Sequence, residues 1–233
     1  MNLSESVEDK SYKRVIRAWT MYDWANSAFA TTIMGAILPT YFATYIATGN
    51  SVPIWGYAVA IGSLLAALLS PILGGIADFK GSKKFFLGIF AALGIISTAL
   101  LFFVSGPEHQ TLCVVLYILG TVGFAGSLVF YDSLLPHVAK PEDMDKVSSR
   151  GYAVGYIGGG LLLLINILMI FLGPNLLTNM SNEAATQLMM RLSLASVAIW
   201  WAVFSIPLFL RVKEPAAMAE KHEIGKNSVI VSF

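Results

Sequence analysis

The sequence predicts an all-α membrane protein with six transmembrane helices. Of its 233 residues, 56% are hydrophobic and only 12% are charged, whereas a soluble domain carries about 25% charged residues. A chain of this composition cannot cover itself with polar side chains in water, so lipid must be its solvent. Six apolar stretches reach the roughly 20 residues that a helix needs to cross a bilayer. They are predicted at 19–47, 55–77, 85–104, 112–131, 151–172 and 189–210.

Short polar links separate the six stretches and contain turn residues, as at Gly106-Pro107 and Gly173-Pro174. We therefore predict one transmembrane domain over 19–210, with a polar N-tail at 1–18 and a polar C-tail at 211–233. The first apolar stretch is much longer than a signal-peptide core of about 7–15 residues. We expect the N-tail to remain on the protein.

The basic residues predict the orientation in the membrane. Fourteen of the fifteen Lys and Arg residues fall in the N-tail, in the links after the second and fourth helices, and in the C-tail. The exception is Arg191, at the start of the sixth helix. Because cytoplasmic loops carry an excess of Lys and Arg, both termini are predicted to be cytoplasmic. We expect a multi-pass protein of the bacterial inner or plasma membrane, with the lipid bilayer as its surroundings.

Several function classes find no support in the sequence. A single cysteine, Cys113, cannot form an internal disulfide, and the three histidines show no metal-ligand spacing. We see no nucleophile–base pair that would indicate an enzyme. The basic residues are spread over four segments, which does not suit a nucleic-acid surface. We expect no cofactor, no metal and no nucleic-acid partner.

The link after the second helix carries the first family resemblance. Its sequence GGIADFKGSKK, at 74–84, resembles the signature loop between helices 2 and 3 of the major facilitator superfamily. The matching residues are Gly74, Asp78, Gly81, Lys83 and Lys84, while Phe79 stands where a basic residue is usual. A glycine at 74 would let the second helix approach a neighbour closely, and one at 81 would allow a tight turn. The resemblance implies a latch between two halves of a transporter; an ordinary basic loop is the alternative.

Four further stretches resemble the vacuole-effluxer branch of that superfamily, which includes autophagy-related amino-acid effluxers. They are WTMYDWANSAFATTI at 19–33, FYDSLLPHVA at 130–139, SSRGYAVGYIGGGLLLLIN at 148–166 and IWWAVFSIPLFL at 199–210. The resemblance implies secondary-active efflux of a small solute by alternating access. Amino acids are the substrate class that the analogy indicates.

Members of that superfamily have about twelve helices in two six-helix halves, each a three-plus-three inverted repeat, with the substrate site between the halves. This chain resembles the N-terminal half alone. We therefore expect a second six-helix half as its partner, either another copy of the chain in a homodimer or a separate chain, unless the sequence is a truncated product. The alternative function is that of a membrane interaction or regulatory half-transporter that does not transport.

The first helix carries a polar face. Asp23, Asn26 and Ser27 are three and four residues apart, which places them on one side of a helix. Asp23 lies about 7 Å into the helix at 1.5 Å per residue, so we expect it near the cytoplasmic rim. This face either lines the transport path or forms hydrogen bonds between packed helices.

A second acidic residue lies at the same rim. The fourth helix ends in Tyr131-Asp132, and Arg150 opens the fifth helix. We hypothesise a cytoplasmic gate in which Arg150 pairs with Asp132 or Asp23, and the alternative is simple anchoring at the interface. Either aspartate could also carry a coupled proton.

The fifth helix begins with a glycine-rich run. Gly151, Gly155 and Gly159 recur every four residues, and Gly160 follows; such small-residue spacing allows close helix contact. The sequence GYIGGG at 155–160 also resembles a GPxxGG motif that is associated with antiporters. Tyr156 replaces the proline, which argues against antiport, and a packing face alone is the alternative.

Two more polar residues are candidates. Asn166 lies near the middle of the fifth helix, either facing a cavity or bonding another helix. Arg191 could contact an anionic substrate or Glu183, or could extend its side chain to the interface.

Overall fold

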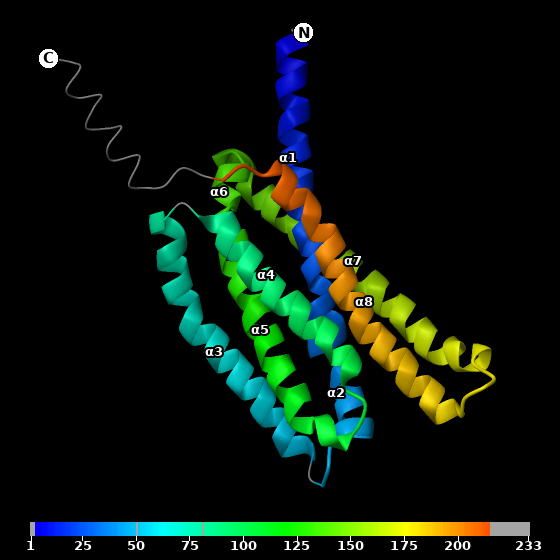
Figure 1. Cartoon of the computed structure of the whole chain (residues 1–233). Helices are drawn as coiled ribbons and strands as arrows, with labels where there is room; N and C mark the ends of the chain where they lie inside the picture. Colours follow the sequence, from blue (N-terminus) through cyan, green and yellow to red (C-terminus); the bar gives the residue numbers. More distant parts are fainter. Residues whose placement is uncertain (1–2, 50, 81, 215–233) are drawn as a thin grey trace, which may run out of the picture.

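The protein is a bundle of long helices, described in this computed structural model for residues 3–49, 51–80 and 82–214 (Figure 1). The first membrane crossing is made of four consecutive pieces: α1, the π-helical segment η1, α2 and a second π-helical segment, η2. Their bounds are Leu3–Ala28, Phe29–Met34, Ile37–Tyr41 and Phe42–Ile46. The other long helices are α3 (Ser51–Lys80), α4 (Lys83–Leu100), α5 (Gln110–Ser133), α7 (Met144–Leu172) and α8 (Asn182–Arg211).

The structure confirms the predicted number of spans. Among the described residues, six helical segments are long and apolar enough to cross a membrane, at Asp9–Ile46, Pro53–Gly75, Lys83–Phe103, Pro107–Val138, Pro141–Leu176 and Asn182–Arg211. Short elements join them: the 3-10 turns η3 (Leu101–Phe103), η4 (Pro107–His109), η5 (Pro141–Asp143) and η6 (Gly173–Leu176), and the short helix α6 (Leu135–Val138). Figure 1 shows that successive spans run in opposite directions.

The helices extend beyond the apolar stretches at several ends. Helix α1 begins at Leu3 rather than near residue 19, and α8 begins at Asn182 rather than near 189. At α8 the cause is local, because the Ser181 hydroxyl accepts a hydrogen bond from the Ala184 N–H at 3.3 Å. Such an N-cap satisfies one of the free N–H groups of the first turn. Polar residues can therefore continue a helix where hydropathy ends.

The pairwise packing of the helices follows a three-plus-three repeat. Helix α5 packs against α3 and α4, and α1 packs in the same way against α7 and α8. Helices α4 and α8, the third member of each set, contact each other. If spans one, two and three trade places with spans four, five and six in that order, the same pairs of spans are in contact. Because each set contains an odd number of spans, the two sets run in opposite directions across the bundle, as an inverted repeat requires.

The centre of the bundle is aromatic and tightly packed. The Phe29 ring lies 5.2 Å from the Phe124 ring and 5.7 Å from the Trp201 ring, centroid to centroid, which joins the first, fourth and sixth spans. Between α4 and α5 the backbones touch, since a Cβ added to Gly123 would lie 2.4 Å from the Gly94 nitrogen. Glycine is the residue that allows such an approach between membrane helices.

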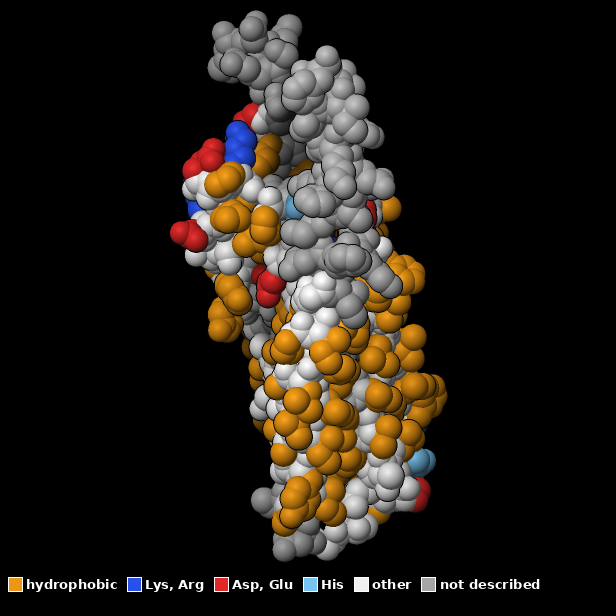
Figure 2. Space-filling view, turned by 90° about the vertical axis from the view of Figure 1, so that its left-hand side faces the viewer, with side chains coloured by type: hydrophobic (Ala, Val, Ile, Leu, Met, Phe, Trp, Pro, Cys, Tyr) orange, Lys and Arg blue, Asp and Glu red, His pale blue; other side chains and the backbone are white. Residues whose placement is uncertain are grey.

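The surface shows a membrane-type distribution of side chains. In Figure 2 apolar side chains cover most of the visible face, and the charged ones gather near one end. That end, at the top of Figure 1, holds the α3–α4 link and α6. We call it the basic end, defined by Lys83, Lys84, Lys140 and Arg150. Helix α3 contributes much of the exposed apolar surface, including Leu64 and Leu68, which are about three-fifths exposed.

Candidate functional site

A cavity lined by polar, aromatic and aliphatic side chains opens between α1, α5 and α7. It has a volume of about 200 Å³ and draws on the first, fourth and fifth spans. Its wall also includes aromatic side chains, which are Trp19, Phe124, Tyr152 and Tyr156. Its polar lining residues are Asp23, Asn26, Ser27, Thr31, Asp132 and Ser148. The predicted polar face of the first helix and the aspartate at the end of the fourth therefore share one cavity.

Asp23 is the most enclosed charged group in this cavity. Its side chain is 7% exposed, and the Tyr131 hydroxyl donates a hydrogen bond to its Oδ2 atom at 3.0 Å. The Tyr131 ring is in turn fixed by stacking on Trp19, with the ring centroids 4.3 Å apart. Tyr131 thus orients the carboxylate from α5.

The glycines of α7 allow α1 to approach closely enough to form the cavity wall. A Cβ added to Gly151 would lie 2.6 Å from Oδ2 of Asp23, and one at Gly155 would lie 2.6 Å from the Ser27 hydroxyl. At Gly159 it would lie 2.8 Å from the carbonyl oxygen of Ser27. Gly160 points elsewhere, with nothing within 4 Å of an added Cβ. The four-residue spacing places the first three glycines against α1 and leaves Gly160 out of this contact.

Asn26 has an unusual environment for an amide. Its side chain is 1% exposed, and its Nδ2 atom has no hydrogen-bond partner among the residues that the structure describes. A buried amide donor without a partner costs free energy. By contrast, Thr31 is well satisfied, because its hydroxyl donates to the Gly159 carbonyl across the contact between η1 and α7 at 3.1 Å.

The predicted gate pair is not assembled in this structure. Asp132 is exposed at the rim of the cavity, and Arg150 is also exposed. Arg150 does not line the cavity, and the described residues contain no ion pair between it and Asp23 or Asp132. The structure thus brings the two aspartates to one cavity and leaves the arginine on the surface.

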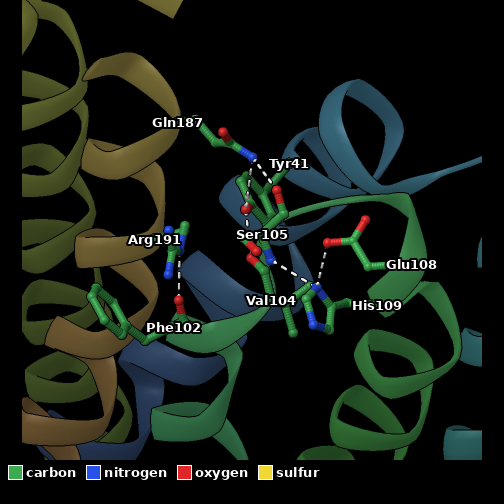
Figure 3. A network of polar contacts seen from close by, with 8 residues as sticks. All are labelled: Tyr41, Phe102, Val104, Ser105, Glu108, His109, Gln187 and Arg191. Carbon is green, nitrogen blue, oxygen red and sulfur yellow. Dashed lines mark hydrogen bonds and ion pairs between the residues drawn. The ribbon is translucent and has the colours of Figure 1, made fainter. Parts of the chain in front are cut away.

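Arg191 belongs to a different polar cluster, beside the link between α4 and α5 (Figure 3). Its Nε donates to the Phe102 carbonyl at 2.6 Å, and its guanidinium lies 4.8 Å from the centre of the Phe102 ring. Nearby, Gln187 Nε2 donates to the Ser105 carbonyl and the Tyr41 hydroxyl donates to the Val104 carbonyl, each at 2.6 Å.

This cluster caps the end of the third span. The last carbonyls of a helix have no partner within it, and a cation there is favoured by the helix dipole. Arg191 is paired with these backbone groups rather than with Glu183, and it does not line the cavity. In this structure the arginine joins α8 to η3, which follows α4 at the end of the third span.

Asn166 lies at the contact between α7 and α8. It is fully buried, and its Oδ1 atom accepts a hydrogen bond from the Ser196 hydroxyl at 2.9 Å. It is absent from the cavity lining. Of the two predicted roles, the contacts correspond to a hydrogen bond between helices.

Comparison with known proteins now identifies the chain. The family model described as vacuole effluxer Atg22 like matches residues 46–233. The chain belongs to the Atg22-like vacuole effluxer family. This confirms the resemblance seen in the sequence motifs.

Curated relatives carry transporter or autophagy names. The chain is 35% identical to the uncharacterized MFS-type transporter YxiO of Bacillus subtilis, over 94% of this chain and 51% of that protein. It is 23% identical to autophagy-related protein 22 of Coccidioides immitis, over 85% of this chain and 47% of that protein. The chain therefore spans about half the length of these relatives. No solved structure matches it.

The Atg22-like chain uses the lysines of its signature-loop sequence to cap two helices. Lys83 Nζ donates to the Ser133 carbonyl at the end of α5 at 3.0 Å. Lys84 Nζ donates to the carbonyls of Phe209 and Val212, at 3.0 and 2.6 Å, where α8 ends. Both cations are therefore placed at the negative ends of helix dipoles.

Of the glycine and acidic positions matched in that loop, the structure describes the surroundings of Gly74. An added Cβ on Gly74 would meet nothing within 4 Å, so the close approach to a neighbouring helix predicted there is absent within the described residues. The side chain of Asp78 and residue Gly81 lie outside the described residues.

Some cavity residues were not predicted from the Atg22-like sequence. Ser148, Tyr152 and Tyr156 lie four residues apart on α7 and all line the cavity. Their spacing was a readable signal, because positions i, i+4 and i+8 share a helix face. Tyr131 was noted only as a neighbour of Asp132, whereas its hydroxyl bonds Asp23. No group of three or more potential metal ligands occurs in the part of the chain that was searched.

Proposed function

We propose that this chain is one six-helix half of a secondary-active transporter that exports a small solute by alternating access. The observation that carries the proposal is the cavity between α1, α5 and α7, with two carboxylates in its wall, in a chain of the Atg22-like family. At about 200 Å³ it is smaller than the roughly 300–1,000 Å³ of most small-molecule sites. A second half would complete it.

The length of the relatives supports a missing partner half. The chain covers 51% of the Bacillus subtilis relative, and a substrate site between two halves needs both. A homodimer and a pair of different six-helix chains both satisfy this requirement. The cavity and the exposed tyrosines Tyr152 and Tyr156 beside it form the face that we assign to the partner half.

Amino acids are the substrate class to test first, by analogy with the branch that the motifs resemble. Purified chain would be reconstituted into lipid vesicles loaded with radiolabelled leucine. We expect leucine to leave these vesicles faster than it leaves leucine-loaded vesicles without protein. Asp23→Asn should lower the release rate about tenfold or more if the carboxylate makes a charge-assisted contact with the solute.

Asp145→Asn provides the matched control for that assay. Asp145 is an exposed carboxylate in the first turn of α7 and does not line the cavity. Its removal should therefore leave the release of leucine unchanged. A folded chain that self-associates but releases no solute would favour the non-transporting alternative. If leucine is released only when a different six-helix chain is reconstituted together with this one, that chain is the partner half.

The orientation is also a proposal. The residues that define the basic end, Lys83, Lys84, Lys140 and Arg150, follow the second and fourth spans, so we place that end and both termini in the cytoplasm. Cys113 is the one cysteine of the sequence and is buried. In a Cys113→Ser background, Lys213→Cys should therefore react with an impermeant maleimide only after the cells are opened. Equal labelling of intact cells would reverse the assignment.

A further inference from the structure

We propose that Arg14 and Arg211 bind the phosphate of an anionic phospholipid in a hollow between α1 and α8. The hollow has a volume of about 280 Å³ and is lined by Ser11, Arg14, Val15 and Arg211. It is separate from the cavity between α1, α5 and α7, since the two share no lining residue. The lipid site goes beyond the proposed function, and neither depends on the other.

The charge of the hollow selects an anion. Its described lining holds two guanidinium groups, Arg14 from α1 and Arg211 from the last turn of α8, and no carboxylate. Both arginines are exposed, as is Ser11 beside them. A guanidinium presents N–H donors in a planar fork that matches the oxygens of a phosphate, and a serine hydroxyl can donate one bond more.

The carboxylates that lie close in sequence to the two arginines are bound to other groups. Asp9 pairs with Lys13, with 2.6 Å between Oδ2 and Nζ. The carboxylate of Glu214 accepts hydrogen bonds from the Lys84 N–H, at 3.0 and 3.2 Å. Among the residues that the structure describes, neither arginine of the hollow makes an ion pair. Their charge is therefore left for an anion from outside the chain.

The depth of the hollow in the membrane favours a lipid as the source of that anion. Helix α8 has 30 residues and ends at Arg211, so it is about 45 Å long at 1.5 Å per residue. A bilayer with its headgroup layers is about 40–45 Å thick, which places Arg211 at the level of the lipid phosphates. Basic pockets between membrane helices are typical binding sites for anionic headgroups.

An apolar stripe leads from Arg211 toward the middle of the membrane. Trp200, Phe204 and Pro207 precede the arginine at the i, i+4, i+7 and i+11 spacing that keeps residues on one helix face. All three are partly exposed. The Trp200 ring lies 4.5 Å from the Phe204 ring and 5.6 Å from the Trp24 ring of α1, centroid to centroid. The stripe thus follows the contact between α1 and α8 and offers a surface to the acyl chains of a lipid whose phosphate is held at its end.

Two lipids with the same acyl chains test the site. The full chain in a neutral detergent would be titrated with dioleoylphosphatidylglycerol, which carries one negative charge, or with dioleoylphosphatidylcholine, whose net charge is zero. Native mass spectrometry would count the bound lipids. We expect the first phosphatidylglycerol molecule to bind at least about tenfold tighter than the first phosphatidylcholine, because its phosphate makes charge-assisted hydrogen bonds without a choline group beside it. Equal affinities would overturn the proposal, and this comparison does not depend on any variant folding.

Three variants separate a site from a general attraction of the basic end for anionic lipid. Arg14→Gln and Arg211→Gln should each lower the affinity for phosphatidylglycerol about tenfold, for the loss of one charge-assisted contact, and leave that for phosphatidylcholine unchanged. Arg150→Gln is the matched control, because Arg150 is an exposed arginine of the basic end that does not line the hollow. It should bind both lipids as the wild type does.

A loss in Arg150→Gln as large as in the two other variants would show a diffuse attraction and overturn the site. Unchanged affinity for phosphatidylglycerol in folded Arg14→Gln and Arg211→Gln would do the same.

Two soluble competitors distinguish a lipid from a free phosphate. Glycerophosphoglycerol carries the headgroup of phosphatidylglycerol without its acyl chains, and inorganic phosphate carries the anion alone. We expect neither to displace phosphatidylglycerol when present at the same concentration, because the stripe on α8 contacts only the chains of a lipid. Displacement by either competitor would assign the hollow to a soluble phosphate compound and refute the lipid.

Discussion

Replacing Gly159 by alanine should weaken the contact between α7 and α1, whereas the same change at the neighbouring Gly160 should not. A Cβ at Gly159 would lie 2.8 Å from the carbonyl oxygen and 3.0 Å from the carbonyl carbon of Ser27. These are backbone atoms, so no side-chain rotation can relieve the contact. At Gly160 an added Cβ meets nothing within 4 Å.

The magnitude follows from two terms. Alanine is favoured over glycine inside a helix by about 1 kcal/mol at either position, and overpacking typically costs about 1–3 kcal/mol. Gly160→Ala should therefore raise the free energy of unfolding by about 1 kcal/mol. Gly159→Ala should lower it by about 0–2 kcal/mol, which leaves a difference between the variants of about 1–3 kcal/mol.

The assay is reversible unfolding in mixed micelles, followed by circular dichroism. Because the propensity term is shared, the difference between the two alanine variants isolates the contact between α7 and α1. A Gly159→Ala chain as stable as Gly160→Ala would show that these helices do not approach as described, and the cavity wall built on that approach would lose its basis.

Three further changes test other contacts. Gly123→Ala should lower the free energy of unfolding in the same assay by about 0–2 kcal/mol after the helix-propensity gain, because its Cβ would lie 2.4 Å from the Gly94 nitrogen. Lys84→Met removes a cation from two carbonyls at the end of α8 and should lower the thermal unfolding midpoint, at a cost of about 1.5–3 kcal/mol. Arg191→Met removes the bond to the carbonyl at 102 and should speed amide hydrogen exchange around the α4–α5 link. The exposed Arg150→Met should leave that exchange unchanged.

Each of these changes has an outcome that contradicts it. An alanine at 123 without loss of stability would mean that α4 and α5 lie further apart. An unchanged melting midpoint in Lys84→Met would leave the lysine without a capping role. Equal exchange rates in the two arginine variants would separate Arg191 from the link that it contacts.

The sequence predicts the span number well because lipid imposes one strong rule, that each crossing needs a long apolar helix. It also predicts that Asp23, Asn26 and Ser27 share a face, since helical spacing is fixed. That Asp132 joins them from α5 follows less directly. Both aspartates lie near the same end of their helices, but only the packing of α1 and α5 decides that they meet.

The partners of the charged residues were harder to predict. Charge complementarity suggested Arg150 for the aspartates, yet a hydroxyl, from Tyr131, holds Asp23. Arg191 and Lys84 bind backbone carbonyls at helix ends. A sequence displays side-chain charges, whereas the carbonyls left free at each helix end exist only once the helix is formed. Pairing of opposite charges is therefore an incomplete guide in a chain with so few of them.

The π-helical segment η1 (Phe29–Met34) changes which residues of the first span lie on the same helical face. A π turn closes a hydrogen bond one residue later than an α turn, and one residue of an α-helix corresponds to a rotation of about 100°. A helical wheel with 3.6 residues per turn that starts at Asp23 therefore assigns Tyr41 to the wrong face of the span. A chain shortened by one residue within 29–34 would close this turn as an α turn and keep the Tyr41 hydroxyl beside the Val104 carbonyl. Alignments of this span should place a gap there rather than force a continuous register.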